Sequence, residues 1–207
     1  MSFALVKYNN NSISDITTAG TLSAGSMILV KEVTASSDAN VSFVHGTSSV
    51  VFDSTYPLYR IDLINVHPAD DRVDFTMNFT SDGTNYNVSK QTNVMECYNW
   101  ENGSSPAFAY RDLDLANSTA EQSLAIGCGN DNDECIVSSI LIFEPASTTF
   151  VKQFIIDTQF TEGQGLCFRQ PIGGYCNTTS AITGVRFKFA SGNIDSGTFK
   201  LYGIKDS

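Results

Sequence analysis

Acidic side chains come close enough together at one place in this chain to suggest metal binding. Asp131, Asp133 and Glu134 lie in the run G-N-D-N-D-E at residues 129–134, and Ca²⁺ is held by carboxylate and carbonyl oxygens. The spacing is not that of an EF-hand loop, which needs a glycine at its sixth position and a glutamate at its twelfth. We interpret the run as a solvated hairpin tip, with a weak calcium site at Asp131, Asp133 and Glu134 as the alternative.

Carboxylates could also cleave a glycosidic bond. The acids considered are Asp62, Asp74 and Glu96, but a glycosidase needs two carboxyls opposed across a cleft, and scattered acids do not locate one. Nucleophilic catalysis has no support, because no G-x-S-x-G elbow is present and neither His45 nor His67 has a recognisable serine or cysteine context. We predict no catalytic residue, no cofactor and no enzyme.

A set of aromatic residues is the clearest candidate for ligand contact. Tyr98, Trp100, Phe108 and Tyr110 lie close to predicted loops, where aromatic rings can stack on sugars or on another subunit. Core packing explains each residue taken alone. As a set they predict an interface or a ligand-binding surface.

The cysteines leave their pairing open. There are five of them, an odd number, at Cys97, Cys128, Cys135, Cys167 and Cys176. A metal site would need a C-x-x-C pair or nearby histidines, and neither is present. We expect buried free thiols, with a disulfide between Cys128 and Cys135 as the alternative.

Charge and hydropathy exclude two classes of partner. The formal net charge is −10 and only 16% of residues are charged, so the protein repels phosphate backbones and nucleic-acid binding is not expected. No apolar run approaches the roughly twenty residues that span a bilayer, so we expect no membrane insertion. Residues 1–11 lack the pattern of a secretory signal, which predicts synthesis in a cytosol without export.

Alternating apolar and polar residues predict an all-β protein. Strands are expected at residues 27–33, 41–44, 50–52, 59–66, 74–80, 94–100, 108–115, 123–127, 135–143, 150–160 and 182–189, followed by a terminal hairpin strand. Residues 113–124 are the one segment that admits a helical turn. Ten to fourteen short strands at this spacing indicate a jelly-roll-like antiparallel β-sandwich.

Two parts of the chain differ in composition. Residues 1–25 are rich in Asn, Ser, Thr and Gly and poor in long apolar runs, which favours an extended N-terminal arm. Residues 26–207 are expected to form a single β-sandwich domain. An arm that docks on a neighbouring chain would serve assembly.

Four segments resemble small structural proteins of tailed bacteriophages, particularly those of marine cyanobacteria. They are N-S-I-S-D-I-T-T-A-G-T-L-S-A-G-S-M-I-L-V-K-E (residues 11–32), V-V-F-D-S-T-Y-P-L-Y-R-I-D-L-I-N-V-H-P-A-D-D (50–71), L-I-F-E-P-A-S-T-T-F-V-K (141–152) and S-G-N-I-D-S-G-T-F-K-L-Y-G-I-K (191–205). The resemblance implies a non-enzymatic virion component with a jelly-roll-like sandwich, a homotrimer assembled in the bacterial host cytoplasm. It carries no catalytic residues over to this chain.

Three functional hypotheses follow. The first is a capsid decoration or head-fibre protein that stabilises the particle through contacts with itself, with the major capsid protein or with other virion proteins. The second is a tail-fibre or tail-appendage protein whose Tyr98, Trp100, Phe108 and Tyr110 contact host-surface glycan. The third is a carbohydrate-active enzyme, which requires a cleft with opposed acids.

Overall fold

The computed structural model describes residues 26–104 and 106–205, and this part of the chain contains strands and no helix. It confirms the predicted all-β antiparallel sandwich. The expected arm, residues 1–25, lies outside the described residues. None of the described residues belongs to a helix able to cross a membrane.

Twelve strands make up the described part. They are β1 (Met27–Asp38), β2 (Val41–Val44), β3 (Leu58–Pro68), β4 (Val73–Thr80), β5 (Lys90–Trp100), β6 (Ala107–Tyr110), β7 (Gln122–Cys128), β8 (Ile136–Phe143), β9 (Lys152–Glu162), β10 (Leu166–Cys176), β11 (Gly184–Phe189) and β12 (Ile194–Ile204). Every strand pair is antiparallel.

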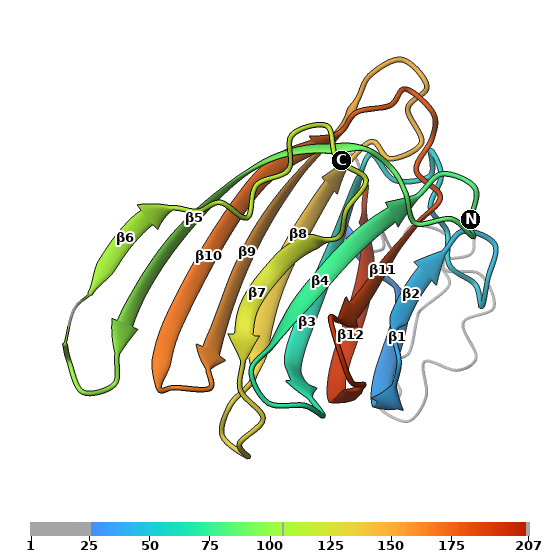
Figure 1. The fold of residues 1–207 in the computed structure, drawn as a ribbon. Coiled ribbons are helices and arrows are strands. Elements are labelled where there is room, and N and C mark those ends of the chain that lie inside the picture. Colours follow the sequence, from blue (N-terminus) through green and yellow to red (C-terminus); the bar gives the residue numbers. More distant parts are fainter. Residues whose placement is uncertain (1–25, 105, 206–207) are drawn as a thin grey trace, which may run out of the picture.

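The strands form two layers of unequal width. The large sheet has the order β1-β12-β3-β8-β9-β10-β5-β6, and the small sheet has the order β2-β11-β4-β7. A single bridge between Cys128 and Glu162 joins β7 to β9. Figure 1 shows the small sheet in front of one part of the large sheet, while β10, β5 and β6 extend past β7.

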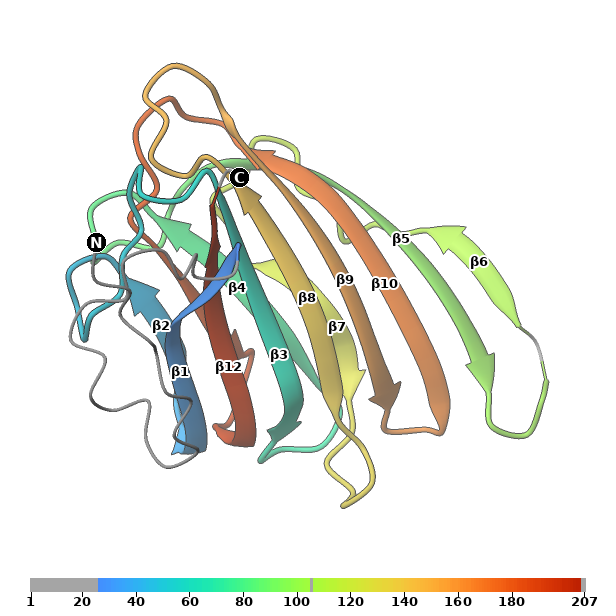
Figure 2. The ribbon, with the colours of Figure 1, turned by 180° about the vertical axis from the view of Figure 1, so that it is seen from behind.

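Eight of the strands form a jelly roll. Strands β1, β12, β3 and β8 face β2, β11, β4 and β7. Consecutive strands of these eight alternate between the two layers, except β4 and β7, which are neighbours in the small sheet, as in a double Greek key. The hairpins β5–β6 and β9–β10 are additions that continue the large sheet beyond β8, as the rear view shows (Figure 2). We call these two hairpins the wing.

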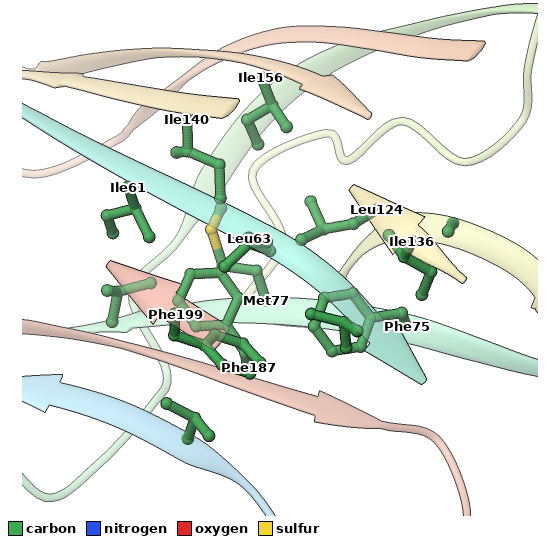
Figure 3. Packing of buried hydrophobic residues seen from close by; sticks show 14 of the residues in the cluster. Ile61, Leu63, Phe75, Met77, Leu124, Ile136, Ile140, Ile156, Phe187 and Phe199 are labelled. Carbon is green, nitrogen blue, oxygen red and sulfur yellow. The ribbon is translucent and has the colours of Figure 1, made fainter. Parts of the chain in front are cut away.

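Alternation along the strands builds the core between the layers. Phe75 and Phe187 of the small sheet and Phe199 of the large sheet are 0% exposed. Their rings pack in series, with centroids 6.2 Å apart for Phe75 and Phe187 and 5.7 Å for Phe187 and Phe199 (Figure 3). Each such ring removes enough apolar surface from water to stabilise the fold by roughly 1.5–3 kcal/mol.

Two predictions about local structure were wrong. Residues 50–52 are not a strand, although Val50 and Phe52 are buried, because the backbone amide of Phe52 donates to Nδ1 of His45 at 3.0 Å instead of to a ladder. Residues 113–124 contain no helical turn. There the backbone carbonyl of Leu115 accepts from the Thr92 amide at 2.8 Å, so this segment follows the edge of β5.

Strand β10 was not predicted at all. Its interior contains Pro171, Gly173 and Gly174, residue types that are unfavourable in strands. Long ladders with β5 on one side and β9 on the other hold it in place nonetheless. Tertiary pairing here overrides local propensity.

Two buried lysines lie in the wing. Lys90 and Lys152 are both 0% exposed and pair in register with Cys176, one from each neighbouring strand. Nζ of Lys90 donates to Oδ1 of Asn78 at 2.6 Å and to the carbonyl of Val88 at 2.9 Å. Both partners are neutral, so burial disfavours the ammonium and lowers the pKa of Lys90 to about 8.

This lowered pKa predicts a pH-dependent stability. Above about pH 8 the folded lysine loses its proton, whereas the unfolded side chain keeps it until pH 10.5. The free energy of unfolding of the wild type should therefore rise from pH 7 to 9 relative to that of Lys90→Met, by roughly 1 kcal/mol. Urea denaturation of both proteins across this range measures the difference, and parallel curves would show that Lys90 titrates alike in both states.

Candidate functional site

A pocket opens where the small sheet ends and the wing continues. It has a volume of about 250 Å³ and lies on the inner face of the large sheet, the face that packs on the small sheet elsewhere. We call it the inner pocket. Its lining consists of Glu96, Tyr98, Trp100, Arg111, Ile126, Gly127, Glu162, Gln164, Leu166 and Phe168.

Strand alternation places three aromatic rings in this pocket. Tyr98 and Trp100 are two residues apart on β5, so their side chains share one face. Across the ladder Tyr98 pairs with Phe168, and their ring centroids are 5.1 Å apart. Phe168 in turn stacks on Phe160 at 5.0 Å, which fixes the pocket wall to the core. Tyr98 and Trp100 remain half-buried, so their rings are available to a ligand.

Glu96 is the chemically unusual group of the inner pocket. It precedes Tyr98 on the same face of β5 and is only 1% exposed. Neither of its carboxylate oxygens has a hydrogen-bond partner among the described residues. Nε of Arg111 lies 3.2 Å from Oε2 and partly compensates the charge. Burial raises the pKa of Glu96, and Arg111 opposes this shift.

The polar atoms beside Glu96 are also unsatisfied. The register of β5 and β10 places Gln170 next to Glu96, and Oε1 of Gln170 has no partner within the described part of the chain. The amide nitrogen of Gln170 donates to the carbonyl of Ser123 at 3.2 Å, while the hydroxyl of Ser123 is itself without a partner there. Buried polar atoms are nearly always paired. Unsatisfied polar atoms therefore extend from Glu96 to Gln170, which is 0% exposed and is not among the residues that line the pocket.

A second carboxylate, Glu162, lies at the other end of the pocket. Its Oε2 accepts from the Gln164 backbone amide at 2.9 Å, and its Oε1 lies 3.7 Å from Arg72. Gly127 passes close by with φ +58°, and a Cβ at Gly127 would lie 3.2 Å from Oε1 of Glu162. These contacts anchor Glu162 to the β9–β10 turn, whereas the Glu96 carboxylate contacts Arg111 through Oε2 and leaves Oε1 without a partner among the described residues.

The four aromatic residues singled out from the sequence do not form one surface. Tyr98 and Trp100 line the inner pocket. Phe108 and Tyr110 pair with Cys97 and Met95, the intervening residues of β5, so they point to the opposite, outer face. They are 71% and 59% exposed.

The three acids considered for glycoside cleavage are also separated. Asp62 accepts from Nε of Arg60 at 2.8 Å and borders a different hollow, and Oδ1 of Asp74 accepts from the Gly127 amide at 2.9 Å. Glu96 alone of the three is in the inner pocket, where its carboxylate companion is Glu162. Sequence reasoning missed Glu162, Arg111 and Phe168, although the period of two along β5 was a sufficient signal to group Glu96 with Tyr98 and Trp100.

The remaining candidates lie away from this pocket. Asp131, Asp133 and Glu134 form the tip between β7 and β8, where Oε2 of Glu134 accepts from the Asp131 amide at 2.9 Å. Within the described residues no group of three or more His, Cys, Asp or Glu side chains is arranged to hold a metal ion. The cysteines, Cys128 and Cys135 included, are free thiols.

We expect Glu96→Gln to stabilise the protein at neutral pH. The raised pKa means that the folded state holds the proton more tightly than the unfolded state, whose carboxyl titrates near 4.5. Ionisation of Glu96 therefore opposes folding as the pH rises above 4.5, and the glutamine variant is free of this effect. Denaturation curves should give Glu96→Gln a higher free energy of unfolding than the wild type at pH 7, and this difference should shrink toward pH 4.5.

Arg111→Met provides the matched control for this prediction. Because Arg111 lowers the pKa of Glu96, its removal should enlarge the loss of stability between pH 4.5 and 7. If Glu96→Gln instead destabilised the protein at pH 7, Glu96 would be a structural group and not one held ready for a ligand.

Comparison of this chain with protein-family models, with curated proteins and with solved structures yields no match.

Proposed function

We propose that this chain is a non-enzymatic saccharide-binding protein that holds a sugar ring of a neutral glycan in the inner pocket. The observation that carries the proposal is the buried carboxylate of Glu96 next to the half-buried rings of Tyr98 and Trp100. Its Oε2 lies 3.2 Å from Arg111, and its Oε1 has no partner among the described residues. Ligand sites typically combine an apolar wall with a few convergent polar groups.

The chemistry of the pocket matches a sugar better than other small ligands. The face of an aromatic ring carries partial negative charge and attracts the C–H groups of a pyranose. The carboxylate oxygens of Glu96 can accept hydrogen bonds from sugar hydroxyls. Hydrogen bonds to a carboxylate are charge-assisted and about twice as strong as neutral ones. The net charge of −10 and the carboxylates of Glu96 and Glu162 disfavour an anionic glycan.

The size of the pocket and the state of its acids favour binding over hydrolysis. A volume of about 250 Å³ is at the lower end for ligand pockets, which suits one ring of a longer chain. Hydrolysis needs two carboxyls that are both free to act on the substrate. Glu162 is already engaged by the Gln164 amide and by Arg72.

The resemblance to phage virion proteins gives this binding a setting. We infer that the chain is a tail-fibre or appendage receptor-binding protein, in which the wing presents the inner pocket to host-surface glycan. The jelly-roll frame supports the inference because it is used both by viral structural proteins and by lectins. The frame would then attach the protein while the added hairpins recognise the host.

Trp100 is the only tryptophan in the chain and therefore reports directly on the inner pocket. Titration with neutral tetrasaccharides of glucose, galactose, mannose or N-acetylglucosamine should shift or quench its fluorescence for at least one of them. Glu96→Gln should weaken that binding about tenfold or more, because a charge-assisted hydrogen bond contributes roughly 1.5–3 kcal/mol. The loss cannot come from unfolding, since this variant is expected to be more stable at neutral pH.

Phe108→Ala is the control, because Phe108 is on the same hairpin as Trp100 but faces away from the pocket. It should leave the fluorescence titration unchanged. An unaltered signal with every saccharide at millimolar concentration would refute the proposal. Release of shorter sugars, abolished by Glu96→Gln, would replace it with the glycosidase hypothesis.

Assembly with copies of itself, as in a capsid decoration protein, is a second candidate function. The observation that favours it is the edge strand β1, which in the described part of the chain pairs only with β12. Met27 and Leu29 on this strand are both 49% exposed. A long edge strand with exposed apolar side chains is a template for association.

For this second candidate we expect light scattering to give the mass of a trimer. Leu29→Lys should raise the protein concentration needed to form the trimer at least tenfold, because an edge lysine opposes strand pairing. Ser36→Lys adds the same charge to the same strand without removing an apolar contact and should have a smaller effect. A monomeric wild type at high micromolar concentration would argue against the assembly role.

A further inference from the structure

A second hollow lies on the outer face of the wing, the side turned away from the inner pocket. It has a volume of about 530 Å³ and is formed by residues of β5, β6, β8, β9 and β10 and by Asp114, which follows β6. We call it the outer groove. Its principal walls are Gln91, Asn93, Tyr110, Phe143, Gln153 and Ile155.

The floor of the outer groove is open because Gly173 has no side chain. Gly173 pairs with Asn93 on β5 and with Ile155 on β9, and both of these side chains stand on the outer face and are exposed. Glycine in a strand interior is unfavourable, so its presence needs a reason.

Packing does not provide that reason for Gly173. The three atoms nearest to a Cβ added there belong to the Asn93 side chain, and the first of them lies at an ordinary contact distance of 3.4 Å. The φ of Gly173 is not positive. The next residue differs, because a Cβ on Gly174 would lie 2.7 Å from the Gln91 carbonyl oxygen and 2.6 Å from the Thr92 side chain. Gly174 is therefore required by the fold, whereas Gly173 serves to keep the groove open.

The groove walls alternate amide and apolar groups. Gln91, Asn93 and Gln153 offer both donors and acceptors. Tyr110 and Ile155 are 59% and 53% exposed and supply apolar surface. Asp114 is the one ionisable carboxyl among the described lining residues, and desolvation together with this neighbour raises the pKa of Tyr110, which keeps its hydroxyl protonated.

The ladder beneath the groove excludes recognition through main-chain pairing. Strand β10 is paired with β5 and β9, and β9 is paired with β8 as well. An extended peptide is commonly recognised by adding a strand to a free sheet edge, and the floor of the groove offers none. A ligand here must bind through side chains alone, as a neutral oligosaccharide can through its hydroxyls.

We propose that the outer groove is a second saccharide site, which takes several rings of a neutral oligosaccharide across β5, β10 and β9. The two sites use opposite faces of the same strands, so one protein can hold two glycan strands at once. Each then raises the effective concentration of the other on a glycan-covered surface. The outer site stands on different residues from the inner pocket and can be tested separately.

Gly173→Val is the decisive variant. Valine is favourable in strands and its added atoms project into the groove, so the fold should persist while the floor is blocked. Isothermal titration calorimetry with the tetrasaccharide panel should give two binding sites per wild-type chain and one per Gly173→Val chain. The variant should bind saccharide in the outer groove at least tenfold more weakly than the wild type does. The Trp100 fluorescence titration should stay unchanged, because that residue faces the inner pocket.

Two further measurements secure the result. A thermal melt of Gly173→Val no lower than that of the wild type excludes unfolding, and Tyr110→Ala should weaken the same site independently. Loss of calorimetric binding in Gly173→Val without any Trp100 response in the wild type would support the outer site and refute the inner one. A Gly173→Val protein that binds as the wild type does, or a wild type with the inner site alone, would overturn the outer site.

Discussion

The two sheets of this protein differ in width, and the position of the inner pocket depends on this difference. In the described part of the chain the large sheet has eight strands and the small sheet that covers it has four. Where the layers face each other, phenylalanines such as Phe75, Phe187 and Phe199 exclude water completely. In the described part of the chain no strand faces the wing beyond β7, and the inward side chains of Tyr98, Trp100 and Phe168 line a pocket there.

The residues of the inner pocket accordingly occupy strand positions that face inward, where a core would have apolar side chains. Glu96 follows the same period along β5 as the fully buried Val94. A carboxylate at such a position opposes folding unless it gains partners, and Arg111 supplies only partial compensation. Proteins tolerate this kind of local cost mainly at functional sites, where activity and stability compete.

The alternation of side chains along the strands of the wing places different residues on its inner and outer faces. On β5, even-numbered residues from Glu96 to Trp100 face inward, and Asn93 and Met95 face outward. Gly174 permits close packing on one face, while Gly173 opens a groove on the other. Hairpins added to a jelly-roll frame thus carry two differently lined hollows on opposite faces, outside the eight strands that fold around the main core.

Much of the architecture could be predicted from the residues in order. Period-two alternation in segments such as residues 59–66, 74–80 and 185–189 indicated strands, since a side-chain repeat of two is a local property of extended chain. Composition in the same way argued against nucleic acid as a partner. The strand β10 escaped detection because Pro171, Gly173 and Gly174 read as a loop, and only pairing with β5 and β9 holds this segment extended.

The residues of the inner pocket could be predicted only in part. Spacing along one strand is enough to place Glu96, Tyr98 and Trp100 on a common face. No local pattern indicates that Glu162, Arg111 and Phe168 join them, or that Phe108 and Tyr110 point away. Those facts depend on strand order, on register and on where the small sheet stops, and such long-range pairings are decided only when the whole tertiary structure forms.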